Sequence, residues 1–267
     1  MKHLLTTTLL LAFAAQPATN DLDLDFRGSQ FRETVLGYVG PNAKKYIKAE
    51  QEGLRITIPG AEKSLPQMGI SSKLAVHGDF EITLSYEMIG SEKPTSGYGA
   101  GLNLTIFADT PEKDSATIAR RTHPKQGEVY ATNRAFKTPN GEDKNNTAMF
   151  PTTATKGKLR FVRGGSVLVF SAAEPSNETF NELRRVEFVD QPLKLVRVTG
   201  DTGKSASGVD FRILSLQIHS RELSPSTTAS TLSGSWTWVI IFALAIPIVV
   251  LASYFGWRFY RKRLDAD

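Results

Sequence analysis

Apolar residues occupy every second position from Phe80 to Met88, and polar residues stand between them. Successive side chains of a β-strand point to opposite faces, so this period of two predicts a strand with one buried face. Shorter segments of the same kind recur along the chain, separated by Gly, Pro, Asn and Asp. We expect strands at Leu22–Arg27, Gly53–Ile58, Gly78–Met88, Tyr98–Phe107, Ala116–Arg121, Glu128–Phe136, Lys158–Arg163, Val167–Ala172, Arg184–Val189, Leu193–Val198 and Val209–His219.

Two local features refine the strand prediction. Gly164 and Gly165 separate two apolar runs, and adjacent glycines supply the positive φ angles that a tight hairpin turn needs. In the last segment the apolar residues change phase after Ile213, from odd to even positions. Such a one-residue change indicates a β-bulge.

The region 20–222 shows no convincing amphipathic helix, because the helical period of apolar residues is absent from it. Many short strands joined by turn residues predict an all-β fold, an antiparallel β-sandwich or jelly roll that forms one domain. Binding residues usually lie on the loops of such a fold. We expect rim loops at the longer irregular segments 41–52, 60–67, 91–97, 109–115 and 138–155.

The N-terminal residues 1–19 have the layout of a secretory signal peptide. Lys2 precedes an apolar run that extends to Phe13, and small residues flank Phe13 on both sides. The run is too short to span a bilayer. We therefore expect a cleaved signal and an exported domain that begins near residue 20; a buried N-terminal helix is the alternative.

An uncharged stretch of 22 residues, from Trp236 to Trp257, predicts one transmembrane helix. At about 1.5 Å per residue it covers roughly 33 Å, which is enough for a hydrocarbon core. Aromatic residues stand at both of its ends, as they do at membrane interfaces. Basic residues follow it in the tail 258–267, and no charge precedes it in 223–235. The positive-inside rule therefore predicts a single-pass cell-membrane protein with a cytoplasmic tail and the domain 20–222 outside the cytoplasm.

The distribution of charge argues against nucleic-acid binding. The chain carries 32 basic and 27 acidic residues, a formal net charge of +5. Lys2 contributes +1 and the tail +2, which leaves 27 basic and 25 acidic residues in 20–222. The domain is thus nearly neutral, without the basic surface that nucleic acid requires. The Ser- and Thr-rich residues 223–235 predict a flexible stalk between the domain and the membrane.

Several sequence blocks together resemble a known superfamily. They are LDLDFRGSQF (22–31), GDFEITLSYE (78–87), GYGAGLNLTIF (97–107), KLRFVRGGSVLVFSA (158–172), FNELRRVEF (180–188) and VRVTGDTGKSASGVDFRILSLQIHS (196–220). In this order they are similar to the concanavalin A-like lectin/glucanase sandwiches, and more closely to bacterial secreted or membrane-tethered domains of that superfamily whose function is not established. The resemblance implies that the first and last strands pair. It supports the fold more than the function, because one fold hosts many unrelated sites.

Glycoside hydrolases of this superfamily use carboxylates on one face of one strand, as in a Glu-x-Asp-x-x-Glu pattern. In retaining enzymes the two carboxyl groups lie about 5 to 5.5 Å apart across the scissile bond. The sequence lacks this pattern. Asp21, Asp23 and Asp25 share a strand face, as do Asp79 and Glu81, but a solvated strand face explains both sets. We therefore expect no catalytic residues and no enzyme activity.

Metal and cofactor sites are not expected either. The domain holds His77, His123 and His219 without a zinc-binding spacing, and the chain has no Cys. The acidic loops 109–114 and 142–146 could offer oxygen ligands to a structural Ca²⁺, but lysines within both loops oppose this. No Gly-x-Ser-x-Gly motif marks a serine nucleophile.

Sugar binding needs aromatic faces that stack on pyranose rings and planar polar groups that bond to hydroxyls. Residues with these properties stand in or beside the central predicted strands. The candidate ligand-binding residues are Tyr98, Arg120, His123, Tyr130, Asn133 and Arg134. Core packing or plain surface exposure is the alternative explanation for each of them.

Three hypotheses for the function follow. The first is a membrane-anchored recognition module that binds a glycan or another surface polymer without catalysis. The second is a structural or adhesive envelope protein whose sandwich binds other proteins, and the third is a divergent glycoside hydrolase. The missing carboxylate pattern and the superfamily resemblance favour the first hypothesis.

Overall fold

A computed structural model describes residues 19–28, 30–60, 65–112, 114–175 and 177–226. The predicted signal peptide apart from Thr19, the stalk from residue 227 onward, the predicted membrane helix 236–257 and the tail 258–267 lie outside the described residues. In the part of the chain that is described, no helix is long and apolar enough to cross a membrane. The chain divides into two units, 1–224 and 225–267, and the first contains the folded domain.

The described residues form fifteen strands and one short 3₁₀-helix, η1. Their bounds are β1 Thr19–Asp25, β2 Leu36–Val39, η1 Ala43–Lys45, β3 Ile47–Glu50, β4 Gly53–Ile58, β5 Met68–Ser72, β6 Leu74–Ser91, β7 Ala100–Ala108, β8 Ser115–His123, β9 Gly127–Lys137, β10 Asp143–Pro151, β11 Lys156–Gly164, β12 Val167–Glu174, β13 Asn177–Glu187, β14 Leu193–Asp201 and β15 Val209–Pro225.

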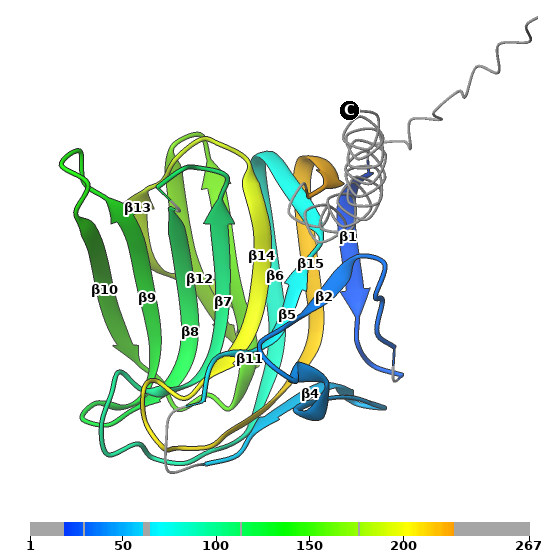
Figure 1. The fold of residues 1–267 in the computed structure, drawn as a ribbon, viewed down its shortest axis with the longest axis vertical. Coiled ribbons are helices and arrows are strands. Elements are labelled where there is room, and N and C mark those ends of the chain that lie inside the picture. The colour runs from blue at the N-terminus through cyan, green and yellow to red at the C-terminus, as the bar shows by residue number, and fades with distance from the viewer. Residues whose placement is uncertain (1–18, 29, 61–64, 113, 176, 227–267) are drawn as a thin grey trace, which may run out of the picture. The chain divides into compact units, whose positions relative to one another are not determined.

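The strands form two antiparallel layers (Figure 1). The front sheet has the order β10-β9-β8-β7-β14-β5-β2. The back sheet has the order β13-β12-β11-β6-β15. Beyond β6, strand β15 pairs with β4 along its first part and with β1 along its later part, and β3 pairs with β4. A single register contact between Leu193 of β14 and Val76 of β6 connects the two layers at one point. The antiparallel sandwich predicted from the alternation of apolar residues is confirmed.

The core lies between the two sheets. The pleat turns alternate residues of a strand inward, as along the middle of β6. Leu102, Leu104 and Ile106 of β7 contribute to the core from the front sheet. Ile82 and Leu84 of β6 contribute from the back sheet, and all five side chains are fully buried. The opposite side of β7 therefore faces away from the core, and its residues are free to build a site.

Three features predicted from sequence are found: the β11–β12 hairpin, the phase change within β15 and the pairing of the first and last strands. A two-residue turn, Gly165 and Ser166, joins β11 to β12. Gly165 has the expected positive φ, 57°, whereas Gly164 ends β11 and is not among the positive-φ glycines. The buried positions of β15 shift from Ile213 to Leu216, where the strand exchanges its partner β4 for β1. First and last strands pair, since β1 lies antiparallel to β15.

Two of the expected rim loops are wrong. The segment 138–155 contains β10, and 41–52 contains η1 and β3. Both strands lie at sheet edges. Strand β10 exposes most of its side chains and β3 exposes two of its four, so neither shows the alternation by which a half-buried strand is recognised. Strands β2 and β5 were also missed, β13 begins seven residues before the predicted Arg184, and β15 continues to Pro225.

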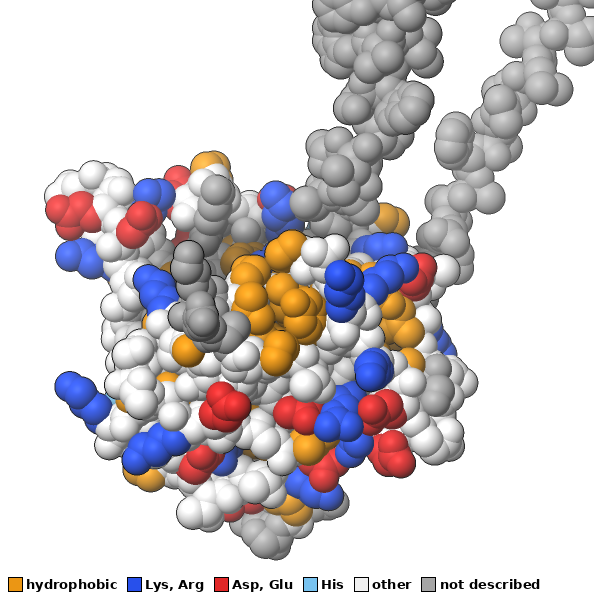
Figure 2. Space-filling view, turned by 60° about the horizontal axis from the view of Figure 1, so that its bottom comes forward, with side chains coloured by type: hydrophobic (Ala, Val, Ile, Leu, Met, Phe, Trp, Pro, Cys, Tyr) orange, Lys and Arg blue, Asp and Glu red, His pale blue; other side chains and the backbone are white. Residues whose placement is uncertain are grey.

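The surface charge agrees with the nearly neutral composition of the domain. On the face shown in Figure 2, acidic and basic side chains lie interspersed around an apolar patch.

Candidate functional site

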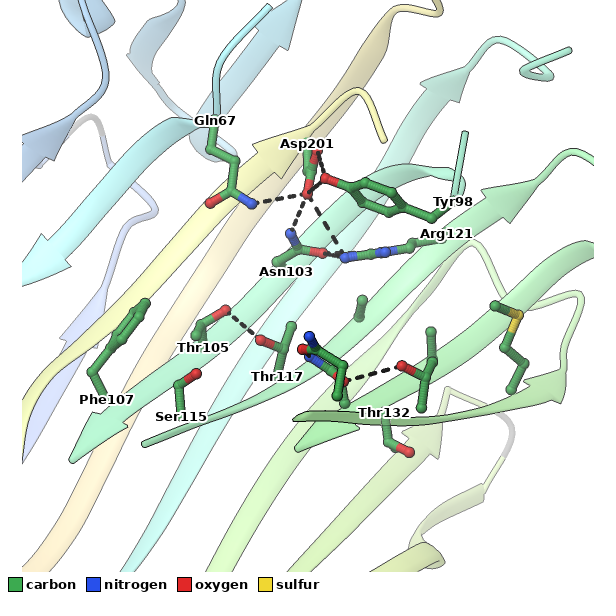
Figure 3. Close-up of a pocket in the computed structure, with 16 residues that line it drawn as sticks. Gln67, Tyr98, Asn103, Thr105, Phe107, Ser115, Thr117, Arg121, Thr132 and Asp201 are labelled. Atoms are coloured by element: carbon green, nitrogen blue, oxygen red, sulfur yellow. Dashed lines mark hydrogen bonds and ion pairs between the residues drawn. The ribbon is translucent and has the colours of Figure 1, made fainter. Parts of the chain in front are cut away.

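A groove of about 440 Å³ lies on the outer face of the front sheet. Strands β7 to β10 form its floor, and residues preceding β5, preceding β7 and ending β14 close one end (Figure 3). Its lining is Gln67, Tyr98, Asn103, Thr105, Phe107, Ser115, Thr117, Ala119, Arg121, Ala131, Thr132, Asn133, Asn145, Thr147, Met149 and Asp201.

A row of hydrogen-bonding side chains crosses the front sheet at right angles to its strands. Each member is the register partner of the next on the neighbouring strand, so all point to the outer face. We call this the polar row: Ser71, Arg197, Thr105, Thr117, Asn133 and Thr147. With strands about 4.8 Å apart, five steps extend over roughly 24 Å.

Internal hydrogen bonds orient part of the polar row. The hydroxyls of Thr105 and Thr117 lie 3.0 Å apart. The Thr147 hydroxyl donates to Asn133 Oδ1 at 3.0 Å, and Asn133 Nδ2 donates to Asn145 Oδ1 at 3.2 Å. These side chains are half-buried or exposed, so their remaining donors and acceptors face the groove.

Small side chains keep the floor beside the polar row low. In the adjacent register row, Ala119 and Ala131 stand between Asn103 and Met149. The two alanines project little above the backbone, so an extended polymer could approach the sheet closely there. Phe107 lies on the other side of the row and offers an apolar ring.

A buried carboxylate closes one end of the groove (Figure 3). Asp201 accepts hydrogen bonds from Gln67 Nε2 at 2.8 Å, from the Tyr98 hydroxyl at 3.2 Å and from Asn103 Nδ2 at 3.1 Å. The Gly203 backbone N–H donates to it at 2.8 Å, and Arg121 Nη2 lies 3.8 Å from Oδ2. The carboxylate is therefore surrounded by donors and fixes the side chains around it.

Arg121 joins this cluster to the floor. Its guanidinium donates from Nη2 to Asn103 Oδ1 at 2.8 Å and lies 5.1 Å from the centre of the Tyr98 ring. Burial lowers the pKa of Arg121, while the nearby Asp201 carboxylate acts in the opposite direction. The pKa of Tyr98 is raised, first by burial and then by the Asp201 charge, so its hydroxyl stays a donor in neutral and mildly alkaline solution.

Three glycines hold Tyr98 in place. The backbone N–H of Tyr98 donates to Gly203 O at 2.9 Å. Gly97, Gly99 and Gly203 all have positive φ angles, between 65° and 97°, and a Cβ on Gly203 would lie 2.2 Å from Gly99 O. Only glycine combines this conformation with so close a backbone contact. The loops before β7 and after β14 are therefore locked together.

The structure brings two of the predicted ligand-binding residues to the groove, Tyr98 and Asn133. Three others point to the core side of the front sheet. Arg120 donates from Nε to Ala154 O at 2.8 Å and pairs with Glu128, Tyr130 lies against Tyr86, and Arg134 pairs with Asp114 at 2.7 Å.

His123 lies at the turn between β8 and β9, where its Nδ1 accepts from the backbone N–H groups of Lys125 and Gln126. It orders the turn and is not among the residues that line the groove.

The phase of alternation explains the misplaced arginine. Arg120 follows Ile118 at a spacing of two and so faces the core, while Arg121 is in phase with Thr117 and faces the groove. The polar residues between the apolar positions of β7, Asn103 and Thr105, carried the same signal. No sequence pattern indicated Asp201, because its role depends on a contact between loops distant in sequence.

Carboxylates are few among the residues that line the groove. Asp201 is the only carboxylate among the residues that line the groove. Among the described residues, no group of three His, Cys, Asp or Glu side chains is placed to hold a metal ion. Asp21 pairs with His219 at 2.9 Å and Asp25 bonds to Arg27 on the surface of the back sheet, away from the groove.

A known protein family matches most of this sequence. Residues 6–234 match the family described as "Protein of unknown function (DUF1583) C domain". The chain belongs to this family. No curated protein matches the sequence.

Solved structures show the fold of this DUF1583 C domain in other proteins. A legume lectin-like domain from Entamoeba histolytica has a TM-score of 0.53 and 14% identity, over 74% of this chain and 96% of its own. A family 16 endo-glucanase from Bacteroides ovatus has a TM-score of 0.54 and 11% identity, over 74% and 99%. A lichenase from a mouse hindgut metagenome has a TM-score of 0.52 and 9% identity, over 75% and 99%. The DUF1583 C domain thus has the concanavalin A-like fold predicted from its sequence.

Proposed function

We propose that this protein is a membrane-anchored, extracytoplasmic recognition module that binds a polysaccharide in the front-sheet groove without cleaving it. The polar row carries the proposal. It places hydroxyl and amide groups at strand spacing across a groove, which suits the repeating hydroxyls of an extended glycan. Tyr98 and Phe107 add aromatic rings on which a pyranose can stack.

The fold supports the same conclusion by analogy. The similar structures include a legume lectin-like domain and an endo-glucanase, and both names refer to proteins that interact with carbohydrates. A shared fold at such low identity does not carry a shared function, so the argument rests on the groove's own residues.

The state of Asp201 supports binding without catalysis. A retaining glycosidase needs a second carboxylate about 5 to 5.5 Å away, and an inverting one about 6.5 to 9.5 Å away. The lining residues include no second carboxylate for Asp201. Its oxygens already accept hydrogen bonds from Gln67, Tyr98, Asn103 and Gly203, so the carboxylate is engaged by the protein itself.

Membrane anchoring rests on sequence alone. The apolar residues after Lys2, the uncharged stretch 236–257 and the basic tail behind it support export and a single-pass anchor with the groove outside the cytoplasm.

A binding assay on the full-length chain tests the proposal, with a detergent that has no sugar headgroup. We expect retention of at least one member of a polysaccharide panel and no release of reducing ends. Asn133→Ala should weaken binding about 5-fold, since it removes a hydrogen-bonding amide from the polar row. Asn181→Ala, an exposed amide on β13, serves as the matched control and should leave binding unchanged.

Two results would overturn it. Release of reducing ends from a bound polymer would make the protein a hydrolase. Binding to no polymer, or equal effects of the Asn133 and Asn181 substitutions, would remove the polar row from the function.

A further inference from the structure

Arg197 is a cation without a counter-charge among the described residues. It lies in the polar row on β14, between Ser71 of β5 and Thr105 of β7. Within the described part of the chain, no carboxylate lies at ion-pair distance from its guanidinium and no group accepts a hydrogen bond from it. Its Nε is buried and unbonded. Buried charges are normally paired, so this arrangement needs an explanation.

The position of the guanidinium is nevertheless defined. It stacks over Phe107, with Cζ 4.9 Å from the ring centre, and Phe107 lines the groove. Partial burial lowers the pKa of Arg197, and no neighbouring charge contributes to that shift. The ring limits the orientations of the half-buried guanidinium. Arg197 is not itself among the residues that line the groove, but its neighbours Thr105 and Phe107 are.

The one carboxylate among the lining residues of the groove does not serve Arg197. Asp201 lies four residues further along β14, about 13 Å away on a strand, and is already engaged by Arg121 and four hydrogen-bond donors. Of the two guanidiniums on this face, Arg121 and Arg197, only Arg121 is close to the Asp201 carboxylate. Lys73, two residues after Ser71, adds a third cation near the Ser71 end of the polar row. Its Nζ donates to Glu33 O at 2.5 Å.

We propose that the polysaccharide bound in the groove is anionic, and that Arg197 receives one of its carboxylate or sulfate groups. This inference rests on the proposed glycan recognition. A guanidinium presents parallel N–H groups that match the two oxygens of a uronate carboxylate or of a sulfate ester. The hydroxyls of Ser71 and Thr105 on either side would bond to neutral hydroxyls of the same sugar residue.

The test compares polymers that differ only in charge. The full-length chain is titrated with polygalacturonate and its methyl ester, and with dextran sulfate and dextran. We expect one anionic polymer to bind at least 10-fold more tightly than its neutral counterpart, and the pair that shows the preference identifies the acid group. Arg197→Gln should reduce this preference about 10-fold, and Arg197→Lys should reduce it less, because it keeps the charge and loses the fork.

The control separates a specific contact from bulk charge. Arg185→Gln removes the same charge from an exposed site on β13 and should leave both affinities unchanged. Equal binding of both members of each pair, or equal losses from the Arg197 and Arg185 substitutions, would overturn the inference while leaving neutral-glycan recognition standing. Retention of no polysaccharide at all would overturn both proposals, and thermal melts confirm that each variant is folded.

Discussion

Asp201 and Arg197 lie on the same face of β14 but differ in their surroundings. Asp201 accepts from four donors and faces Arg121, whereas Arg197 has no hydrogen-bond acceptor among the described residues. A buried charge with hydrogen-bond and ion-pair partners orients the side chains around it, whereas a buried charge without partners lowers the stability of the folded protein. We therefore assign Asp201 to the architecture of the groove and Arg197 to recognition.

Asp201→Asn should destabilise the protein by about 2 kcal/mol. The amide loses the charge that Arg121 faces, and its NH₂ group would confront the donors of Gln67 and Asn103. The free energy of unfolding in urea measures the effect. Asp143→Asn, at a carboxylate whose side chain is 80% exposed, should change it by less than about 0.5 kcal/mol. Equal effects of the two substitutions would contradict the structural role of Asp201.

Arg197→Met should stabilise the folded protein by about 1 kcal/mol while it weakens binding of an anionic polymer. The substitution removes a partly buried charge that has no partner among the described residues, and the thioether keeps contact with Phe107. Stability sacrificed at a binding site is a common pattern. Urea unfolding measures the change, and a loss of stability greater than about 1 kcal/mol would show that Arg197 serves packing instead.

Residue identities in the site were partly predictable. The sequence placed Tyr98 and Asn133 among the candidates, and both line the groove. The alternation of β8 also distinguishes Arg121 from Arg120, but only when the strand's phase is read from Ile118. Asp201 and Arg197 could not be predicted from the sequence. The hydrogen-bond partners of Asp201 and the lack of a partner for Arg197 among the described residues both depend on strands far apart in sequence.

At the scale of elements, two loops meet at the end of the groove. Gly203 and Gly99 approach so closely that a Cβ at Gly203 would lie 2.2 Å from Gly99 O. This contact positions Tyr98, whose N–H bonds to Gly203 O. The loops before β7 and after β14 thus act as one element, although about a hundred residues separate them along the chain.

Gly203→Ala should lower the free energy of unfolding by about 3 kcal/mol and weaken glycan binding. The change adds a steric clash to the strain of a positive φ. Gly141→Ala is the matched control, since Gly141 has a φ of 80° but nothing lies within 4 Å of the position that a Cβ would take there. It should cost about 1 kcal/mol and leave binding unchanged. Equal losses of binding would mean that the loop contact does not position Tyr98.

Strands β6, β11 and β15 are tied by an ion-pair cluster on the back sheet. Glu87 Oε1 lies 2.8 Å from Lys156 Nζ, and its Oε2 lies 2.9 Å from Arg212 Nη1. The Lys156 hydrogen bond and then the Arg212 hydrogen bond lower the pKa of Glu87 below its usual 4.5, against the opposing effect of burial. A carboxyl with a depressed folded pKa stabilises the protein above its unfolded pKa, and this stabilisation is lost as the pH falls through the folded value.

Glu87→Gln should therefore cost about 1 kcal/mol at pH 7, and the difference from the wild type should shrink below pH 4.5. Urea unfolding between pH 3 and 7 measures it. Glu33→Gln, at an exposed carboxylate paired with Lys44 at 3.4 Å, should show a much smaller difference. A constant difference across the pH range would contradict the assignment of the effect to the Glu87 charge.

Elements with one buried face were predictable, and edge elements were not. The central part of β6 was recognised because its buried residues alternate with polar ones. Strand β10 is exposed along most of its length, so its sequence resembles a loop and only pairing with β9 reveals it. Because β10 contributes Thr147 and Met149 to the groove, the extent of the site could not be foreseen.

At the scale of the whole domain, the two sheets have different outer faces. The back sheet carries ion pairs that join neighbouring strands, including those of Glu87 and of Arg55 with Asp210. The front sheet carries the groove, the polar row and Arg197, whose buried Nε has no partner among the described residues. The shared sandwich explains neither face, since lectin-like and glucanase structures have the same architecture.

Hydroxyl-radical footprinting with a bound polysaccharide tests the central claim most directly. Met149 lies in the groove on β10, and Met88 lies on β6 of the back sheet; both side chains are half-buried, so they form a matched pair. We predict that a saturating polymer lowers the oxidation rate of Met149 several-fold relative to Met88. Protection of Met88 alone, or equal protection of both, would contradict recognition at the front-sheet groove.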